Sequence, residues 1–282
     1  MTKKRIIIFA VVVVLISAIV IWGIHDNSAL SVTNYNIKSE KLPDNFNGYK
    51  IAVVSDLHNA KIGKNNEKLL SMLQSTTPDI IAITGDMIDS RHTNIDTAIE
   101  FAKKALEIAP CYYVAGNHES RIENYDDFEK DLEKTGVNIL NDKQIKLENE
   151  GQTISLLGVK DSTFQKGHQL YSAEEFISSK LDNFEIDSNE YNVLLAHRPE
   201  IFDVYAKHNI DLTLSGHTHG GQVRLPFVGC LAVPDQGFFP KYDSGKYSQD
   251  KSTMIISRGI GNSMVPLRIN NPPEIVLVTL SK

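Results

Sequence analysis

Five times along this chain, a short apolar run rich in β-branched residues stops abruptly at small and polar residues. The runs cover residues 51–54, 79–84, 111–115, 191–196 and 211–215. Their length and composition predict buried strands. Between the first three runs, residues 65–75 and 95–108 carry apolar side chains at helical spacing. Buried strands that alternate with helices predict a parallel sheet with right-handed crossovers, and therefore an α/β fold.

Asp, Asn or His side chains follow each of these runs within a few residues. They are Asp56 and His58, Asp86, Asn117 and His118, His197, and finally His217 and His219. Ligands of parallel sheets gather at the carboxyl ends of the strands. Glycine at position 216 allows the backbone to turn sharply before the last two histidines. We therefore expect these side chains to converge on one site.

The chemistry of this set predicts a metal centre. Apart from His118 it offers seven nitrogen and oxygen donors and no thiolate, which suits Mn, Fe, Zn or Co. Seven donors are too many for one tetrahedral ion. Two ions about 3.5–4 Å apart would use all of them if one carboxylate bridges, and such a pair activates a shared water for in-line attack at phosphorus. His118 need not be a ligand and could protonate the leaving alkoxide.

The order of these motifs resembles the calcineurin-like metallophosphoesterase family. The blocks are Asp56-x-His58, Gly85-Asp86, Gly116-Asn117-His118-Glu119, Ala196-His197 and Gly216-His217-Thr218-His219. The residues from Gly220 to Pro226, Pro266-Leu267-Arg268 and Asn271-Pro272-Pro273-Glu274 resemble a membrane-associated bacterial branch. That branch includes YkuE- and YaeI-like phosphodiesterases and enzymes that cleave a UDP-linked diacylglucosamine.

The resemblance implies a sandwich of two facing mixed sheets flanked by helices, in the order α/β/β/α. It also implies that Asp56, His58, Asp86 and His219 hold one ion, and that Asp86, Asn117, His197 and His217 hold the other, with Asp86 bridging. A metal-bridging hydroxide would then attack phosphorus, and His118 would protonate the leaving group. The expected activity is that of a phosphodiesterase, with manganese among the candidate ions. A phosphomonoesterase or protein phosphatase, and an inactive metal-binding sensor or scaffold, remain alternatives.

The first 25 residues do not resemble the rest of the chain. Lys3, Lys4 and Arg5 precede an uncharged run from residue 6 to 24. About 19 apolar residues are enough to cross a bilayer as a helix, so this run predicts one N-terminal transmembrane anchor. The basic flank predicts that the remainder lies outside the cytoplasm. Ser28-Ala29 could be a cleavage site, so a cleaved signal peptide is the alternative to an anchor. The expected organisation is an anchor over 1–25, a linker and edge strand over 26–48, and a catalytic domain over 49–282.

The net charge and the composition limit the kinds of partner that the protein can bind. The anchor holds three of the 29 Lys and Arg and none of the 35 Asp and Glu, so the remainder has a net charge of −9. An acidic domain is a poor general binder of nucleic acid. The expected substrate is a phosphodiester, lipid-linked or derived from the cell envelope. Cys111 and Cys230 are expected to be isolated thiols. Arg198 and Arg224 could meet substrate phosphate or form salt bridges.

One aromatic group stands apart from the motifs. Its members are Phe227, Phe238, Phe239, Tyr242 and Tyr247. These side chains could pack in the core or within a loop, or they could form a rim that faces lipid or the membrane.

Overall fold

Two mixed β-sheets form the centre of the computed structural model, which describes residues 2–166, 171–263 and 267–282. The first sheet has the strand order β1-β16-β2-β3-β4-β5. Strands β2 to β5 run parallel to one another, and β16 runs antiparallel to β2. The bounds are β1 (Ser31–Lys38), β2 (Lys50–Val54), β3 (Ile80–Thr84), β4 (Cys111–Val114), β5 (Asn138–Ile139) and β16 (Glu274–Ser281).

The second sheet faces the first and has the strand order β14-β15-β9-β8-β7-β6. Its inner strands β15, β9, β8 and β7 are parallel, and both edge strands are antiparallel to their neighbours. The bounds are β6 (Lys143–Asn149), β7 (Gln152–Gly158), β8 (Asn192–Leu195), β9 (Leu212–Ser215), β14 (Gly245–Gln249) and β15 (Ser252–Ile256).

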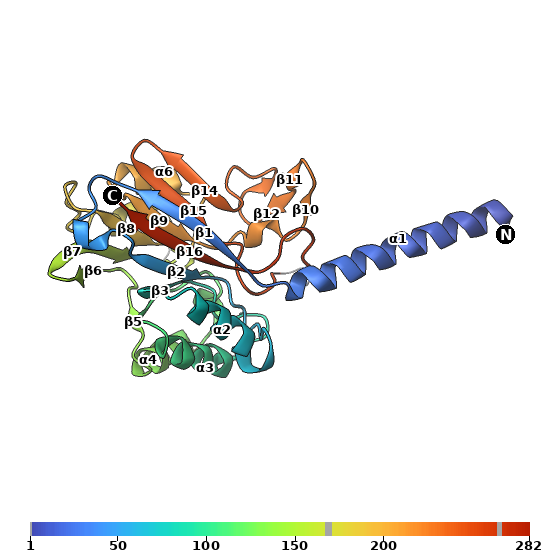
Figure 1. Ribbon diagram of the computed structural model, residues 1–282, viewed down its shortest axis with the longest axis horizontal. Coiled ribbons are helices and arrows are strands. Elements are labelled where there is room, and N and C mark those ends of the chain that lie inside the picture. The colour runs from blue at the N-terminus through green and yellow to red at the C-terminus, as the bar shows by residue number, and fades with distance from the viewer. Residues whose placement is uncertain (1, 167–170, 264–266) are drawn as a thin grey trace.

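Helices cover the outer face of each sheet, as Figure 1 shows. Those on the first sheet are α2 (Glu67–Ser75), α3 (Ile95–Leu106) and α4 (Tyr125–Lys134), and those on the second are α5 (Ala173–Leu181) and α6 (Phe202–Lys207). Single-turn 3-10 helices lie in the connections: η1 (Asp44–Phe46), η2 (Lys64–Asn66), η3 (Glu119–Arg121), η4 (Ser162–Phe164) and η5 (His219–Gly221).

Alternate residues of each strand enter different cores, because successive side chains of a strand point to opposite faces. On β2, Ala52 and Val54 pack toward the helices, whereas Ile51 and Val53 pack between the sheets. A third core joins the second sheet to α5 and α6. The layers are therefore α/β/β/α, and the expected fold is confirmed.

One predicted helix begins at a different residue, and two further segments form short strands. Helix α2 begins at Glu67 rather than at residue 65, because Asn65 and Asn66 have left-handed φ values of 50° and 63°. The short β5 pairs with β4 of the first sheet rather than with the strands that follow it. Residues 224–238 form two small antiparallel hairpins, β10 (Arg224–Leu225) with β11 (Gly229–Cys230), and β12 (Ala232–Val233) with β13 (Gly237–Phe238).

The N-terminal segment forms α1 (Lys3–Ser28), which projects away from the sandwich (Figure 1). Its carboxyl end is tied to the body where the Arg268 backbone N–H donates to Asn27 Oδ1 at 2.9 Å and that of Asn270 donates to Asp26 Oδ2 at 2.5 Å. Over the parts of the chain that the structure describes, no helix combines the length and the apolar character needed to cross a membrane. The predicted transmembrane helix is thus not confirmed. Pro266, part of the branch resemblance, lies outside the described residues.

Candidate metal centre

The strand-end residues of both sheets meet at one edge of the sandwich. Strands β2, β3 and β4 bring them from the first sheet, and β8 and β9 bring them from the second. All are buried, with at most 8% of the residue exposed. They are Asp56, His58, Asp86, Asn117, His118, His197, His217 and His219.

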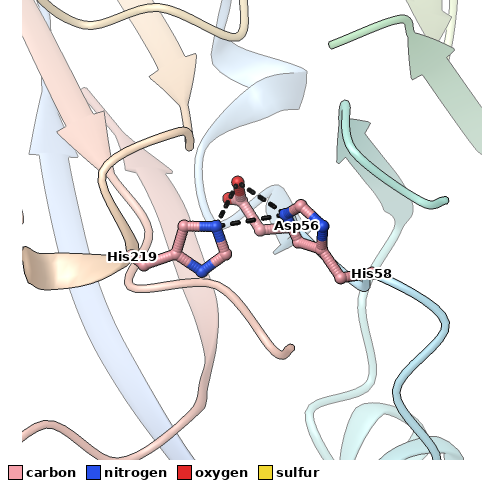
Figure 2. A group of neighbouring side chains, drawn as sticks. All are labelled: Asp56, His58 and His219. Atoms are coloured by element: carbon pink, nitrogen blue, oxygen red, sulfur yellow. Dashed lines mark hydrogen bonds and ion pairs between the residues drawn. The ribbon is translucent and has the colours of Figure 1, made fainter. Parts of the chain in front are cut away.

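One group of donors consists of Asp56, His58 and His219 (Figure 2). The two imidazole Nε2 atoms lie 3.1 Å apart, and Asp56 Oδ1 lies 3.4 Å from the His219 nitrogen and 4.0 Å from that of His58. Two imidazole nitrogens that face each other beside a buried carboxylate form a set that a cation would satisfy. The donors therefore fit a divalent ion.

A second group consists of Asp86, His197 and Asn117. His197 Nε2 lies 3.3 Å from Asp86 Oδ2 and 3.1 Å from Asn117 Oδ1. The same oxygen of Asp86 lies 3.4 Å from His58 Nε2, which belongs to the first group. One carboxylate oxygen therefore joins the two groups, as a bridging ligand must.

The His197 ring is oriented by the backbone. Its Nδ1 lies 2.7 Å from the Thr84 carbonyl oxygen, which fixes Nδ1 as the protonated nitrogen and leaves Nε2 as a lone-pair donor. The neighbouring Asp86 carboxylate opposes the effect of burial and raises the pKa of His197 to about 10 in the absence of bound ions. A cation at this position would replace that proton.

His217 lies beside these groups. Its ring centroid is 5.0 Å from that of His197, and its backbone N–H donates to both oxygens of Asp56 at 3.1 Å. Its Nε2, however, lies 3.0 Å from Oδ2 of Asp235. The structure thus places a seventh predicted ligand next to the others and adds a carboxylate partner that the sequence analysis did not single out.

His118 lies at the edge of the first group, with its ring centroid 4.4 Å from that of His58 in a T-shaped arrangement. Its Nδ1 accepts a hydrogen bond from the Ser90 backbone N–H at 3.0 Å and lies 3.5 Å from Asp89 Oδ1. Burial lowers the pKa of His118 to about 4, although the nearby aspartates act in the opposite direction. The ring can also be grouped with His58 and Asp86 as a donor set.

The backbone of the site is strained at the donors themselves. Asp56, His58, Asp86, His217 and His219 all have φ between 45° and 72°. Left-handed backbone is uncommon for residues with a side chain, and such strain concentrates at functional sites. It allows two donors separated by one residue to face the same volume.

Two motif glycines lie where the backbone closely approaches a donor carboxylate. A Cβ on Gly116 would lie 2.3 Å from Asp86 Oδ1, and one on Gly216 would lie 2.3 Å from Asp56 Oδ2. Any side chain at these positions would displace a donor carboxylate.

Glu119 supports the centre without belonging to either donor group. Its Oε2 accepts the backbone N–H groups of Asp86 and Gly116, both at 2.9 Å, and its Oε1 accepts that of Ile88 at 3.2 Å. Burial raises the pKa of this carboxyl to about 7. Glu119 belongs to the Gly116–Glu119 motif, and its position directly after Asn117-His118 is the only sign of this role in the sequence.

Asp235 and Glu200 are the other residues that the sequence analysis missed. Asp235 contacts both His217 and the guanidinium of Arg198, which also binds Asp161 and Glu200. Hydrogen bonding to His217 lowers the pKa of Asp235. Pro234-Asp235-Gln236-Gly237 is recognisable as a turn, but nothing in the sequence places that turn beside His217.

The structure shows what Arg198, Arg224 and the aromatic group contact. Arg198 forms the ion pairs described above, and Arg224 Nη1 lies 2.7 Å from Asp243 Oδ2. Tyr242 is buried against Phe202 and Tyr247. The aromatic group is therefore divided, because Phe227, Phe238 and Phe239 are exposed. Cys111 and Cys230 are free thiols, as expected.

The fold and the site point to one class of protein, and comparison with known families identifies the same class. Residues 49–221, more than half of the chain, match the calcineurin-like phosphoesterase family. The chain belongs to this family and, by its relatives, to the YkuE-like branch. It is a metal-dependent phosphoester hydrolase by family, and the family typically uses two divalent ions.

Its relatives include bacterial and animal proteins. It is 30% identical to an uncharacterized metallophosphoesterase of Aquifex aeolicus, over 89% of this chain and 92% of the relative. It is 28% identical to the metallophosphoesterase YkuE of Bacillus subtilis, over 89% of this chain and 85% of that protein. It is also 27% identical to a zebrafish transmembrane protein with a metallophosphoesterase domain, over 89% of this chain and 57% of that protein.

Proposed function

We propose that this protein is a membrane-attached phosphodiesterase with a dinuclear metal centre. The observation that carries the proposal is the position of Asp86 Oδ2, 3.4 Å from His58 Nε2 and 3.3 Å from His197 Nε2. A carboxylate shared between two histidine groups matches a pair of ions better than one ion.

The proposed ligands divide along the two donor groups. Asp56, His58, Asp86 and His219 would hold one ion, and Asp86, Asn117, His197 and His217 would hold the other. Mn, Fe, Zn and Co all suit this set of nitrogen and oxygen donors. When bound, two such ions lower the pKa of a water and neutralise charge on a phosphoryl group. The neutral amide of Asn117 contributes a ligand oxygen without repelling an anionic substrate.

His118 is the proposed general acid. Its Nδ1 faces Ser90 and Asp89, which leaves Nε2 as the atom that can meet a leaving oxygen. The low pKa of the ring means that it holds little proton by itself at neutral pH. An anionic phosphodiester beside the ring, together with Asp89, would raise that pKa and favour the protonated form.

The ion pairs around the site favour a diester over a monoester. Arg198 and Arg224 each follow a site motif, and both are neutralised by carboxylates, so neither offers an unpaired guanidinium. A phosphomonoester carries nearly two negative charges at neutral pH and gains most from an unpaired guanidinium. A phosphodiester carries one, and it needs less positive charge beyond the ions themselves.

Membrane attachment through α1 is part of the proposal. Ile7, Val14 and Ile21 of this helix are 62%, 66% and 67% exposed. Exposed apolar side chains of this kind gain free energy when lipid replaces water around them. Lys3, Lys4 and Arg5 at the amino end favour a cytoplasmic start, which would place the sandwich outside the cytoplasm. A reporter fused to the carboxyl end tests this; cytoplasmic reporter activity would refute the orientation.

The activity is tested with two chromogenic esters. The full-length chain, loaded with Mn, is expected to hydrolyse bis(p-nitrophenyl) phosphate faster than p-nitrophenyl phosphate. Asn117→Ala should lose most of this activity because one donor group loses its amide oxygen, whereas Asn34→Ala on the exposed edge of β1 should keep it. A preference for the monoester would refute the diesterase proposal and favour a phosphomonoesterase or protein phosphatase.

A metal-binding sensor or scaffold without activity is the rival from another class. It would be favoured if the chain binds two ions but hydrolyses neither ester faster than Asn117→Ala does. The position of His118 beside both donor groups argues against it, since a scaffold has no use for a leaving-group acid.

A further inference from the structure

An apolar pocket opens directly beside the metal centre. Its volume is about 410 Å³, within the range of about 300–1,000 Å³ that small-molecule sites occupy. One wall is the turn after β9, with His219, Gln222 and Val223, and the other is the second hairpin, with Leu231, Val233 and Pro234. His219 belongs to the first donor group as well, so the pocket borders the metal centre.

The pocket wall is held firmly against the metal centre. A Cβ on Gly221 would lie 1.9 Å from Cys230 Sγ, so the turn after His219 packs directly on the hairpin segment. Asp235, in the turn between β12 and β13, binds His217. The wall formed by the second hairpin is therefore fixed relative to the donors, and the pocket is a preformed feature of the site.

The same two hairpins expose aromatic side chains. Phe227 in the first hairpin is fully exposed, and Phe238 and Phe239 at the end of the second are 81% and 71% exposed. Large exposed apolar side chains that lie close together gain free energy when lipid replaces water around them, and they mark a contact surface.

The hairpins are continuous with the base of α1. Arg224 at the start of the first hairpin donates its backbone N–H to the Ile269 carbonyl at 3.0 Å, and Ile269 donates to the Gln222 carbonyl at 3.0 Å. The adjoining Arg268 and Asn270 hold the carboxyl end of α1. Figure 1 shows α1 and the hairpins at the same end of the molecule. The apolar helix, the exposed aromatics and the pocket thus form one face.

We propose that this face rests on a membrane and that the pocket takes a hydrocarbon chain of a membrane phospholipid whose phosphodiester lies at the metal centre. This proposal rests on the proposed function for its reaction and for membrane attachment, whereas binding of the hydrocarbon chain in the pocket is tested separately. The exposed Phe side chains and α1 would fix the height of the pocket above the bilayer. A chain drawn into the pocket would then leave the membrane over a short path next to His219.

Binding is tested by crosslinking, which needs no catalysis. The full-length chain is reconstituted into phosphatidylcholine vesicles that contain a phosphatidylglycerol with a photoactivatable diazirine at the end of one acyl chain. Crosslinks are expected at residues 231–234 as well as on α1. Val233→Asn, and independently Leu231→Asn, should reduce the pocket crosslinks at least severalfold because they place an amide in the apolar wall. Val228→Asn, a matched change on the other hairpin and outside the pocket, should not.

Crosslinks confined to α1 and the hairpin tips would overturn the pocket assignment. Equal pocket crosslinking in all three variants would overturn it too.

Specificity is tested with alkyl p-nitrophenyl phosphates that share one leaving group. From methyl to octyl, kcat/KM is expected to rise, by up to about fourfold for each methylene that the pocket buries. The rise should be smaller in Val233→Asn than in Val228→Asn in the same vesicles, which cancels partitioning of the ester into lipid. Hydrolysis of every ester without this difference would refute the pocket and leave the proposed function standing. Hydrolysis of none, with pocket crosslinks retained, would refute the diesterase instead.

Discussion

The carboxylate of Glu119 should be the most sensitive support of the metal centre. It accepts three backbone N–H groups, those of Asp86, Gly116 and Ile88, and no part of Glu119 is exposed. In Glu119→Ala all three donors lose their partner. An unsatisfied buried donor costs about 1–3 kcal/mol, so the substitution should lower the free energy of unfolding by roughly 3–9 kcal/mol. That is comparable with the whole stability of a domain, about 5–15 kcal/mol.

Glu119→Gln should cost less. Its amide oxygen can stay where Oε2 now accepts two of the N–H groups, while its NH₂ faces only the N–H of Ile88. The N–H of Ile88 and the buried NH₂ are then both unsatisfied donors, which corresponds to about 2–6 kcal/mol. The free energy of unfolding is measured by urea titration of the metal-free chain, with the exposed Glu148→Ala as control. If Glu119→Ala destabilises no more than that control, or if Gln and Ala are equal, the three hydrogen bonds do not contribute as argued.

Three further predictions concern the metal centre and the thiols. Asp235→Ala should weaken binding of the second ion by about 10–100-fold, because His217 loses the partner of its Nε2. Asp235→Asn should recover part of the loss. Calorimetric titration with Mn measures the affinity, and an unchanged affinity would contradict this role of Asp235. Chelation should lower the melting temperature, since ions at 100 times their Kd stabilise the folded chain by about 2.7 kcal/mol, and a melting temperature indifferent to chelator and metal would contradict the assigned ligands. Cys111 should resist iodoacetamide at pH 8 until the chain is denatured, because burial raises the pKa of its thiol to about 12; rapid labelling of the native protein, read by mass spectrometry, would count against the buried position.

The second hairpin combines two roles in one short segment. Asp235 orients a proposed ligand, whereas Phe238 and Phe239 are exposed. A change at Asp235 should affect metal binding, and a change at the phenylalanines should affect only contact with lipid. This division can be checked by measuring both properties in both sets of variants.

The layers of the sandwich and the positions of the donors could be predicted from the sequence. Asp56, Asp86 and His197 each follow a run of apolar residues, and a run of that kind indicates a buried strand without knowledge of its neighbours. The carboxyl ends of parallel strands then bring such residues to one edge. These inferences are local, because each depends on the spacing of side chains within about ten residues.

Only the tertiary structure decided which distant residues touch. The contact of His217 with Asp235, and the pocket wall formed by Val233, depend on how residues 224–238 fold as two hairpins against the turn after β9. The division of the aromatic group, with Tyr242 buried and Phe227 exposed, depends on the same packing. These hairpins have strands of two residues, too short for a periodic pattern to appear in the sequence. A sequence records the period of an element, but the partners of a short irregular segment are set by long-range packing.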